Sequence, residues 1–399
     1  MLKGFKMVVS EVTSQIRDRI PVSAIRAEDY VSTDNMRPNF GGIDTSSSSP
    51  PSGNVTAYQE GDILLSNIRP YFRKTWLATH SGGCNADVLC IRANPDKCLP
   101  KYLYYLFTTD NFVNDYLKSC KGAKMPRGDV QRLLDYEFDL PDLPTQLRIA
   151  GVLGSLDEKI ALNRKKIAEL EALAKTIYDY WFVQFDFPDK DGKPYKSSGG
   201  KMVWNEQLKR EIPEGWEVGT LSDIVTITMG QSPNGSRLNE SGDGTLFFQG
   251  SSDFGDVVPS NRVYTLSPTR MAYAGDVLLS VRAPVGATNI ALLPCCIGRG
   301  LAALRGTDCS NIFILQTLSL VKSRFAAKNV DGTTFGSLSK DELCGLEILK
   351  PPVVTIHAFD DLANPIMEQV LGLVRSIRET SSLRDILLPL LMNGQVVVK

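Results

Sequence analysis

The chain has 399 residues and a mass of 43.9 kDa, which is enough for two or three domains and excludes a single small module. Its 44 basic and 45 acidic residues leave a net charge of −1, so any contact with nucleic acid has to be local or shared with partners. No stretch approaches about 18 uncharged apolar residues, and the N-terminus lacks an apolar signal core. We therefore expect a cytoplasmic protein that neither spans a membrane nor is secreted.

In chain order, the predicted elements form two similar series, each mixing strands with short helices. The first series has a Ser/Gly/Pro-rich loop over residues 41–54, a strand over 62–69, a helix over 102–117 and a strand over 136–141. A long helix and a second loop, residues 188–200, follow. The second series has strands over residues 277–281 and 287–293, a helix over 311–322, a strand over 346–351 and another long helix. Both halves are therefore predicted to be mixed α and β.

The two series belong to an internal repeat. The segment from Ala57 to Ser66 resembles the segment from Ala272 to Ser280, and the aligned residues Asp62 and Asp276 are 214 positions apart. The strands that end in Pro141 and Pro351 are 210 positions apart. A loop deletion accounts for this small difference in offset.

Both long helices carry the pattern of a coiled-coil seam, with inward positions spaced alternately by four and three residues. In the first helix these positions are Ile149, Leu153, Leu156, Ile160, Asn163, Ile167, Leu170, Ala174, Ile177 and Trp181. In the second they are Phe359, Ala363, Ile366, Val370, Leu373, Ile377, Thr380, Arg384, Leu387 and Leu391. The polar break at Asn163 is a candidate for setting the register of the pair.

Connectivity favours an antiparallel pair. Each globular half leads into the N-terminal end of its own helix, so a second half at the far end of the first helix requires the second helix to run back. A span over residues 149–181 has a length of roughly 50 Å at a rise of about 1.5 Å per residue. That length equals about 14 to 15 steps of B-form DNA at ~3.4 Å per step.

Local charge is more informative than the total. Residues 118–132 contain five cations and one anion, and residues 262–328 contain eight cations and two anions. Each half therefore has a candidate surface for DNA phosphates, although some of these charges are expected to be ordinary solvated ones.

Base reading requires polar or basic side chains on loops. In the first half, the candidates for contacts with DNA are Asn35, Arg37, Asn67, Arg69, Tyr71, Lys74, Lys121, Lys124 and Arg127. In the second half they are Gln231, Ser232, Asn234, Arg237, Arg282, Arg299 and Thr334. Turn-forming propensity explains the Asn and Ser residues at such places equally well without DNA.

Catalytic motifs are missing. The sequence has no G-x-x-x-x-G-K-[ST] loop and no G-x-G-x-x-G fingerprint after a strand. The eight cysteines form no C-x-x-C pair, and only His80 and His357 could complete a zinc site or a Ser/His/Asp arrangement. The aspartates Asp189 and Asp191 lie too close together, in one turn, to build a nuclease metal site. We therefore expect reduced thiols, no metal and no catalysis by this chain alone.

Several segments together carry a family likeness: the residues 30–36 (YVSTDNM), the two Gly-Asp strands, residues 180–188 (YWFVQFDFP), residues 192–201 (GKPYKSSGGK) and residues 212–216 (IPEGW). The chain resembles the specificity subunit of Type I restriction-modification systems over nearly its whole length. The resemblance implies an α+β fold with two mixed α/β target-recognition domains, separated by a pair of long antiparallel coiled-coil helices and related by a pseudo-twofold internal repeat. The first half has no counterpart of Gly215-Trp216, so the residues before Ile20 are expected to differ.

The resemblance also implies a domain order and a set of partners. The expected order is a first recognition domain over residues 1–142, a first long helix over 143–183, a linker over 184–210, a second recognition domain over 211–352 and a second long helix over 353–399. Each domain would read one half of a split target in double-stranded DNA, and the helices would set the gap and bind two methyltransferase subunits, which recruit motor-nuclease subunits. S-adenosylmethionine, ATP and Mg would be bound by those partners, with no cofactor on this chain.

Two alternatives remain open from the sequence. A coiled-coil scaffold that binds only protein leaves the two basic regions unexplained. A stand-alone nuclease or methyltransferase requires motifs that the sequence does not contain.

Overall fold

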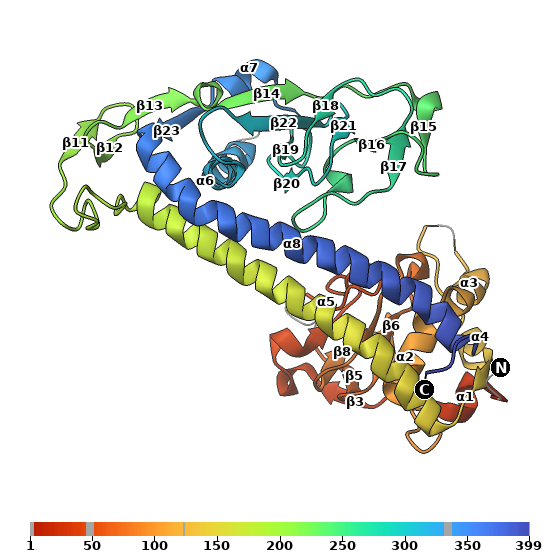
Figure 1. Ribbon diagram of the computed structural model, residues 1–399. Helices are drawn as coiled ribbons and strands as arrows, with labels where there is room; N and C mark the ends of the chain where they lie inside the picture. Colours follow the sequence, from red (N-terminus) through yellow and green to blue (C-terminus); the bar gives the residue numbers. More distant parts are fainter. Residues whose placement is uncertain (1–3, 45–51, 123, 331–336, 399) are drawn as a thin grey trace. The chain divides into compact units, whose positions relative to one another are not determined.

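A computed structural model describes residues 4–44, 52–122, 124–330 and 337–398, and the side chains of all of these except residues 323–330 (Figure 1). The chain forms two compact units. The first consists of Met1–Ala161 with Arg378–Lys399, and the second consists of Leu162–Ile377. The boundary between the units therefore passes through both long helices.

The first unit contains two four-stranded sheets and one two-stranded ladder. One sheet has the order β2-β9-β6-β7, with β2 Thr13–Ile16, β9 Val88–Ala93, β6 Ile63–Ser66 and β7 Thr75–Leu77, all antiparallel. The other has the order β3-β5-β8-β4, with β3 Arg19–Pro21, β5 Asn54–Tyr58, β8 Gly82–Cys84 and β4 Tyr30–Val31, where β4 runs parallel to β8. The ladder joins β1 Phe5–Val8 to β10 Glu137–Leu140. The strand predicted over residues 136–141 is confirmed as β10. The strand predicted over residues 62–69 is confirmed only as β6 over Ile63–Ser66, because the chain turns after Ser66 and Arg69 has a left-handed backbone.

The short helices of the first unit contribute buried side chains to one hydrophobic core. They are α1 Val9–Val12, α2 Pro100–Thr108, α3 Asp110–Lys118 and α4 Val130–Leu134. The predicted helix over residues 102–117 is thus two helices, because Thr109 has an extended backbone and its side chain accepts a hydrogen bond from the backbone nitrogen of Phe112, which caps α3. The core joins Ile63, Ile91 and Phe107 to residues of both long helices, Leu153 and Leu391 among them.

The second unit repeats the first of these sheets, whereas its other sheet has five strands. One sheet has the order β14-β22-β19-β20, with β14 Val225–Met229, β22 Leu301–Gly306, β19 Val277–Ser280 and β20 Thr288–Ile290. The other has the order β15-β17-β16-β21-β18, with β15 Leu238–Asn239, β17 Val263–Thr265, β16 Thr245–Phe248, β21 Cys295–Ile297 and β18 Met271–Ala272. Two ladders join β13 Glu217–Thr220 to β23 Glu347–Lys350 and β11 Met202–Asn205 to β12 Arg210–Pro213. The helices are α6 Asn311–Val330 and α7 Lys340–Cys344.

Matching ladders confirm the internal repeat. In each unit the central strand, β6 or β19, pairs with the strand that carries an arginine opposite its buried aspartate. Asp62 binds Arg92 through two hydrogen bonds of 2.7 and 2.8 Å, and Asp276 binds Arg305 through two of 2.8 and 2.9 Å. The same fold and the same ion pair therefore occur twice.

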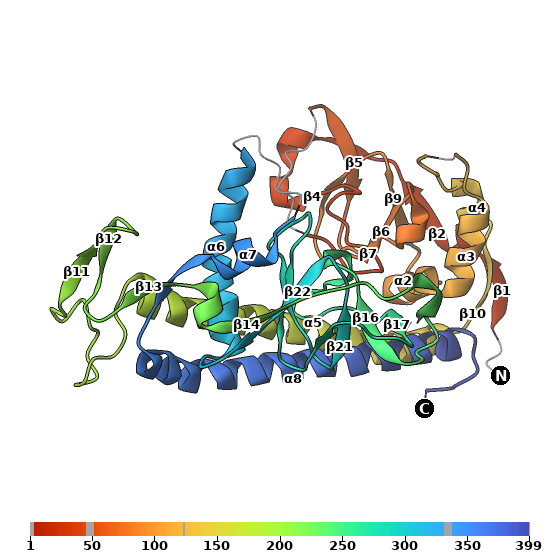
Figure 2. The same cartoon turned by 90° about the horizontal axis from the view of Figure 1, so that it is seen from above.

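The two long helices are α5 Leu143–Tyr178, continued by a π-helical turn over Asp179–Val183, and α8 Val353–Met392. In the second unit their segments are antiparallel, because Asn163 contacts Ser376 at 3.2 Å while the ring of Tyr178 lies 5.8 Å from that of Phe359. In the first unit, Asp157 of α5 pairs with Arg384 of α8 at 2.9 Å. Figure 2 shows the helices side by side from a second direction.

The seam positions lie on the facing sides of these helices with one difference at the end of α5. Of the predicted set, these are buried: Ile149, Leu153, Ile160, Asn163, Ile167, Ala174, Trp181, Phe359, Ala363, Ile366, Val370, Thr380 and Leu391. These are half-buried: Leu156, Leu170, Ile177, Leu373, Ile377, Arg384 and Leu387. Trp181 lies in the π-helical turn and not in the α-helix, and its ring is 6.0 Å from Phe359 in the core of the second unit.

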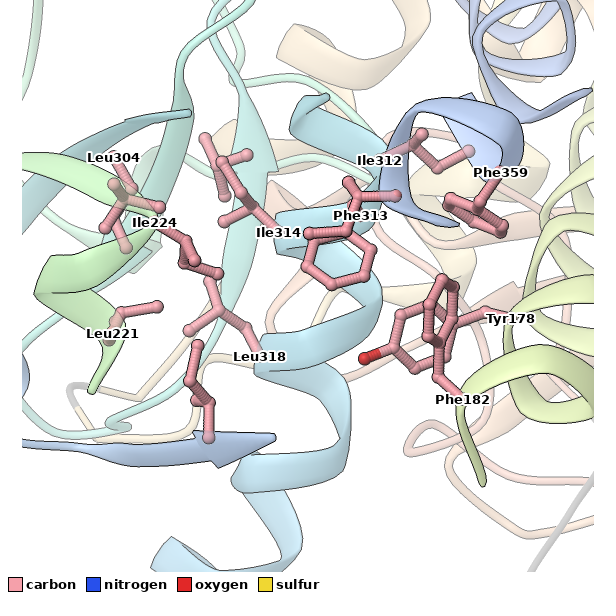
Figure 3. Packing of buried hydrophobic residues seen from close by; sticks show 14 of the residues in the cluster. Tyr178, Phe182, Leu221, Ile224, Leu304, Ile312, Phe313, Ile314, Leu318 and Phe359 are labelled. Atoms are coloured by element: carbon pink, nitrogen blue, oxygen red, sulfur yellow. The ribbon is translucent and has the colours of Figure 1, made fainter. Parts of the chain in front are cut away.

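Aromatic residues from three segments close that core (Figure 3). Phe182 contacts Phe313 of α6 and Phe359 of α8 with ring centroids 5.1 and 5.2 Å apart. The linker that follows is ordered by a stack of Phe187 on Tyr195 and Trp216. Among the residues that the structure describes, no helix is both long and apolar enough to cross a membrane.

Candidate nucleic-acid interface

In the first unit, the turn after β6 and the residues joined by the Lys121–Arg127 β-bridge form one corner. Ile68 forms a β-bridge with Arg127, which also bridges Lys121. The backbone nitrogen of Arg69 donates to the carbonyl of Pro126 at 2.8 Å. The structure thereby brings together four of the predicted residues, Asn67, Arg69, Lys121 and Arg127, from two segments that are far apart in sequence.

This first corner carries exposed cations and aromatic rings. The side chains of Lys121 and Arg127 are 86% and 58% exposed, and each has an acidic neighbour, Asp129 at 3.8 Å and Asp87 at 2.7 Å. Lys124 is exposed, and the described residues offer it no ion pair. The exposed rings of Tyr71 and Phe72 lie 4.6 Å apart on the same turn. Exposed cations beside aromatic rings are a suitable surface for nucleic acid.

The second unit builds the equivalent corner from the turn after β19. Arg282 forms a β-bridge with Ser337, just as Ile68 does with Arg127. The backbone nitrogen of Val281 donates to the carbonyl of Gly300 at 2.9 Å, which brings Arg299 to the same place. Arg282 and Arg299 are exposed. Thr334, which the sequence assigned to this region, lies outside the described residues.

Three polar side chains extend this second corner. The hydroxyl of Ser232 accepts a hydrogen bond from the backbone nitrogen of Arg299 at 3.3 Å and lies 3.0 to 3.2 Å from the side-chain amide of Gln249. Gln231 is exposed next to Ser232. Gln249 is also exposed, and an amide of this kind can pair with both N6 and N7 of adenine.

Gln249 was missed by the sequence analysis. It directly follows β16, and only the folded structure brings it to the second corner, where Gly298 and Gly300 lie close to its backbone. A Cβ atom on Gly300 would lie 2.6 Å from the carbonyl oxygen of Gln249, and one on Gly298 would lie 3.0 Å from its Cα. The segment Gly298-Arg299-Gly300 was therefore the available signal.

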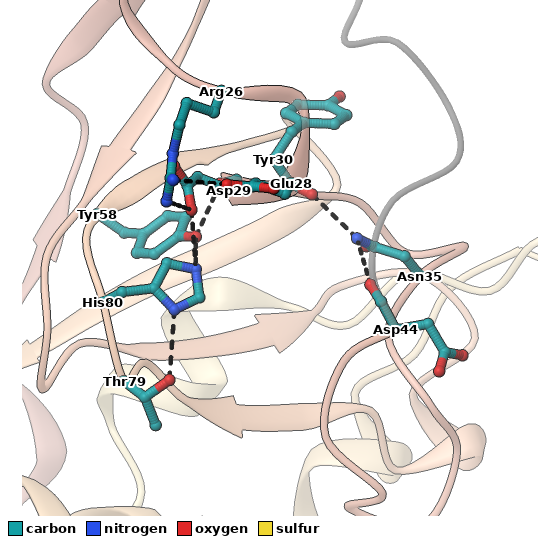
Figure 4. Close-up of polar contacts among 9 residues, drawn as sticks. All are labelled: Arg26, Glu28, Asp29, Tyr30, Asn35, Asp44, Tyr58, Thr79 and His80. Carbon is teal, nitrogen blue, oxygen red and sulfur yellow. Dashed lines mark hydrogen bonds and ion pairs between the residues drawn. The ribbon is translucent and has the colours of Figure 1, made fainter. Parts of the chain in front are cut away.

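Other predicted residues are used inside the protein. Asn35 is buried, its side-chain nitrogen donates to the carbonyls of Tyr30 and Asp44 at 2.9 and 3.3 Å, and its oxygen accepts from the backbone of Ser32 at 2.7 Å (Figure 4). This amide holds the turn after β4 and has no capacity left for a base. We therefore remove Asn35 from the candidate interface.

Three further assignments change for the same reason. The ammonium of Lys74 donates to the carbonyl of Thr33 at 2.6 Å. The side-chain oxygen of Asn67 accepts from the hydroxyl of Tyr116 at 2.6 Å, and that of Asn234 accepts from the backbone nitrogen of Ser236 at 3.1 Å. These side chains stabilise local turns, and we expect them to act on DNA at most by positioning their neighbours.

The two arginines of the outer loops have different surroundings. Arg37 pairs with Asp44, the residue whose carbonyl also binds Asn35. Arg237 is exposed at the end of a short 3₁₀ turn, Gly235–Arg237. Neither belongs to the corners that β6 and β19 form.

His80, between β7 and β8, lies in a network of polar contacts (Figure 4). His80 is 3.5 Å from the carboxylate of Asp29 and 3.3 Å from the hydroxyls of Tyr58 and Thr79. Arg26 already binds Asp29 through two hydrogen bonds, which hold the pKa of that carboxyl below its usual value, and burial raises the pKa of Tyr58. This network fixes the loop before β4 and presents no activated nucleophile.

The acidic turn near residue 190 is also structural. A side-chain oxygen of Asp189 accepts hydrogen bonds from the backbone nitrogens of Asp191 and Lys193 at 2.8 and 2.9 Å, and these bonds lower the pKa of Asp189. Within the described residues, no three side chains of the His, Cys, Asp or Glu type gather as a metal site requires. The cysteines of the chain are free thiols.

Comparison with known proteins places both units in one group. The model of the Type I restriction modification DNA specificity domain matches residues 28–172 and 213–356, once in each repeat. A putative type I restriction enzyme MjaX specificity subunit of Methanocaldococcus jannaschii is 31% identical over 351 residues, which cover 85% of this chain and 79% of the relative. The type I restriction enzyme HindI specificity subunit of Haemophilus influenzae is 22% identical over 403 residues, which cover 85% and 87% of the two chains.

A solved structure has the same fold. The S subunit of a Type I restriction-modification system from M. genitalium superposes with a TM-score of 0.59 at 14% identity, over 98% of this chain and 96% of the other. At that identity the similarity concerns the fold alone.

Proposed function

The chain belongs to the family of Type I restriction-modification specificity subunits, and on that premise we propose that each of its two units reads one part of a split DNA target while the long helices set the unread gap. The chain is the DNA-recognition subunit of a restriction-modification complex and is not catalytic alone. The alternatives of a protein-only scaffold and of a stand-alone enzyme have no support from the site.

The observation that carries this proposal is the corner that occurs twice. The turns after β6 and β19 are equivalent in the repeat, both form a β-bridge to a second segment, and both have exposed basic side chains beside that bridge. A scaffold has no reason to repeat an exposed basic corner on each unit, whereas a reader of two half-sites needs one on each.

The partners in this proposal are two methyltransferase subunits and the motor-nuclease subunits that join them. The long helices offer apolar side chains to solvent, as a protein-binding surface requires. These exposed residues are Leu147, Leu162, Leu173, Leu362 and Leu383. S-adenosylmethionine, ATP and Mg are then bound by the partners and not by this chain.

The test is a selection from a pool of randomised DNA duplexes at several salt concentrations, with and without the methyltransferase partner. We expect the retained DNA to contain two short fixed blocks separated by a gap of constant length. Absence of enrichment in both conditions would contradict the proposal and favour a scaffold.

A further inference from the structure

Arg69 has an unusual and rigid backbone. Its φ and ψ angles are 47° and 56°, in the left-handed region that residues other than glycine rarely adopt. The backbone is fixed on both sides, because its nitrogen donates to the carbonyl of Pro126 at 2.8 Å and its carbonyl accepts from Phe72 at 3.0 Å. Pro70 follows directly and is buried.

Arg69 belongs to a group of strained residues. Four of the six non-glycine residues with positive φ in the described chain are Asn39, Phe40, Arg69 and Arg73. They lie together, since the backbone nitrogens of Asn39 and Phe40 donate to the carbonyls of Phe72 and Arg73, each at 2.9 Å. Strain of this kind persists where a structure holds a side chain in place for a function.

Among the residues that the structure describes, none forms a hydrogen bond or ion pair with the side chain of Arg69. Its Nε is buried and is the only buried side-chain nitrogen or oxygen among the described residues without a hydrogen bond. By contrast, Arg73 on the same turn pairs with Asp110 at 2.7 Å, and Arg127 pairs with Asp87 at 2.7 Å. A buried donor without an acceptor is costly, so the side chain gains free energy when it turns toward an acceptor outside the chain.

The second unit carries its arginine at a different position. Ser66 and Pro70 align with Ser280 and Pro284, both 214 positions later, so the counterpart of Arg69 is Ala283. The exposed arginine there is Arg282, one residue earlier. Successive residues point in different directions from a chain, so the two corners present a guanidinium differently. That difference suits two units that read different sequences.

From these observations we propose that Arg69 is a specificity-determining residue that reads a guanine in the half of the target bound by the first unit. This inference rests on the proposed function. A guanidinium on a backbone fixed in this way fits the paired acceptors O6 and N7 of guanine, whereas an exposed cation such as Lys124 suits a phosphate. Arg282 is the corresponding reader in the second unit.

The experiment uses the full chain with its methyltransferase partner and the DNA that the selection retains. Each guanine of the two blocks is replaced in turn by 7-deazaguanine, which keeps the base pair but lacks the N7 acceptor. For the unmodified protein we expect one position in each block to lose affinity by roughly 5- to 150-fold. Arg69→Ala should be nearly insensitive to the replacement in the block that Arg69 reads, because that contact is already gone, and should stay sensitive to the replacement in the other block.

Matched variants separate base reading from simple charge. Arg69→Ala and Arg282→Ala should relax different blocks, while Lys124→Gln should weaken all sequences equally and keep both blocks intact. Arg69→Gln retains hydrogen-bonding capacity and should shift the preferred base from guanine toward adenine. Arg69→Gln also provides the test if Arg69→Ala does not fold.

Several outcomes would overturn the inference. One is an Arg69 variant that selects the same sequences as the parent. Another is an equal loss of affinity for every sequence. A third is a target in which the block that Arg69→Ala relaxes contains no guanine. In these cases the parent still selects two blocks, so the proposed function stands. If the parent selects no blocks, the proposed function fails and this assignment fails with it.

Discussion

At the residue scale, one ion pair shows what both units share. Asp62 is 1% exposed, binds the guanidinium of Arg92 twice and accepts a hydrogen bond from the backbone nitrogen of Gln59 at 2.9 Å. Asp276 does the same with Arg305 and the backbone nitrogen of Tyr273 at 2.7 Å. Each carboxylate therefore ties the turn before the central strand to the neighbouring strand.

We predict that Asp62→Asn lowers the free energy of unfolding by about 3 kcal/mol, because it leaves the charge of Arg92 without its buried partner. Asp276→Asn should have a smaller effect, because the side chain of Arg305 is 50% exposed against 33% for Arg92 and its charge is better solvated. Urea unfolding measures both, with exposed Asp96→Asn as the control. A loss below about 1 kcal/mol, the usual value for a surface pair, would show that the pair is not a structural element of the repeat.

Asn163 is the polar residue in the helix seam, 7% exposed, and its side-chain nitrogen donates to the hydroxyl of Ser376 at 3.2 Å. We predict that Asn163→Leu raises the thermal midpoint, because a polar group in a seam reduces stability, but lets the register vary. The register is measured as the spread of gap lengths in selected DNA.

Ser376→Ala is the matched variant for that experiment. It removes only the partner of Asn163 and should lower stability by about 1 kcal/mol with a single gap retained. If Asn163→Leu changes neither the midpoint nor the gap, Asn163 has no role in the register.

At the scale of elements, the basic residues at the Lys121–Arg127 β-bridge provide the charge of the first corner. Replacement of Lys121, Lys124 and Arg127 by Gln should weaken DNA binding and flatten the slope of log K against log salt by at most about 2.7, since each phosphate contact contributes ~0.9. The ion pairs with Asp129 and Asp87 reduce the contributions of Lys121 and Arg127 to this slope, so Lys124 should make the largest contribution of the three.

The control for this salt titration removes equal charge from a helix. Replacement of Lys159, Lys165 and Lys166 of α5 by Gln leaves the corner intact, and we expect a smaller change in the slope. Equal flattening by both triple variants would mean that overall charge, and not the first corner, governs DNA binding.

The long helices lead to a prediction about length. One heptad inserted after Ala161 in α5 and one after Ile377 in α8 keeps the seam continuous. Seven residues add about 10.5 Å, so the selected gap should lengthen by about three base pairs at ~3.4 Å per step. A heptad inserted in α5 alone should abolish the discrete gap, and an unchanged gap in the double insertion would exclude the helices as the spacer.

At the scale of the whole molecule, the division of labour among subunits can be tested. We predict that the purified chain does not bind S-adenosylmethionine in calorimetric titrations and that binding is found when the methyltransferase partner is present. Binding of the methyl donor by the chain alone would contradict the assignment of cofactors to partners.

The sequence by itself determined the repeated architecture. The Gly-Asp strands, the proline-ended strands and the heptad spacing of the two long helices are local patterns, and each was visible twice, so one copy supported the other. For the same reason the strands over residues 277–281 and 346–351 agree closely with β19 and β23.

The tertiary structure decided where local patterns are interrupted and which polar side chains remain free. Thr109 divides a predicted helix, and the π-helical turn takes Trp181 out of the α-helix and into the second core. Asn67 and Arg69 are two residues apart and look alike as turn residues. Only the fold brings Tyr116 to Asn67 and leaves Nε of Arg69 without an acceptor among the described residues, because hydrogen-bond partners some fifty positions away have no signature in the local sequence.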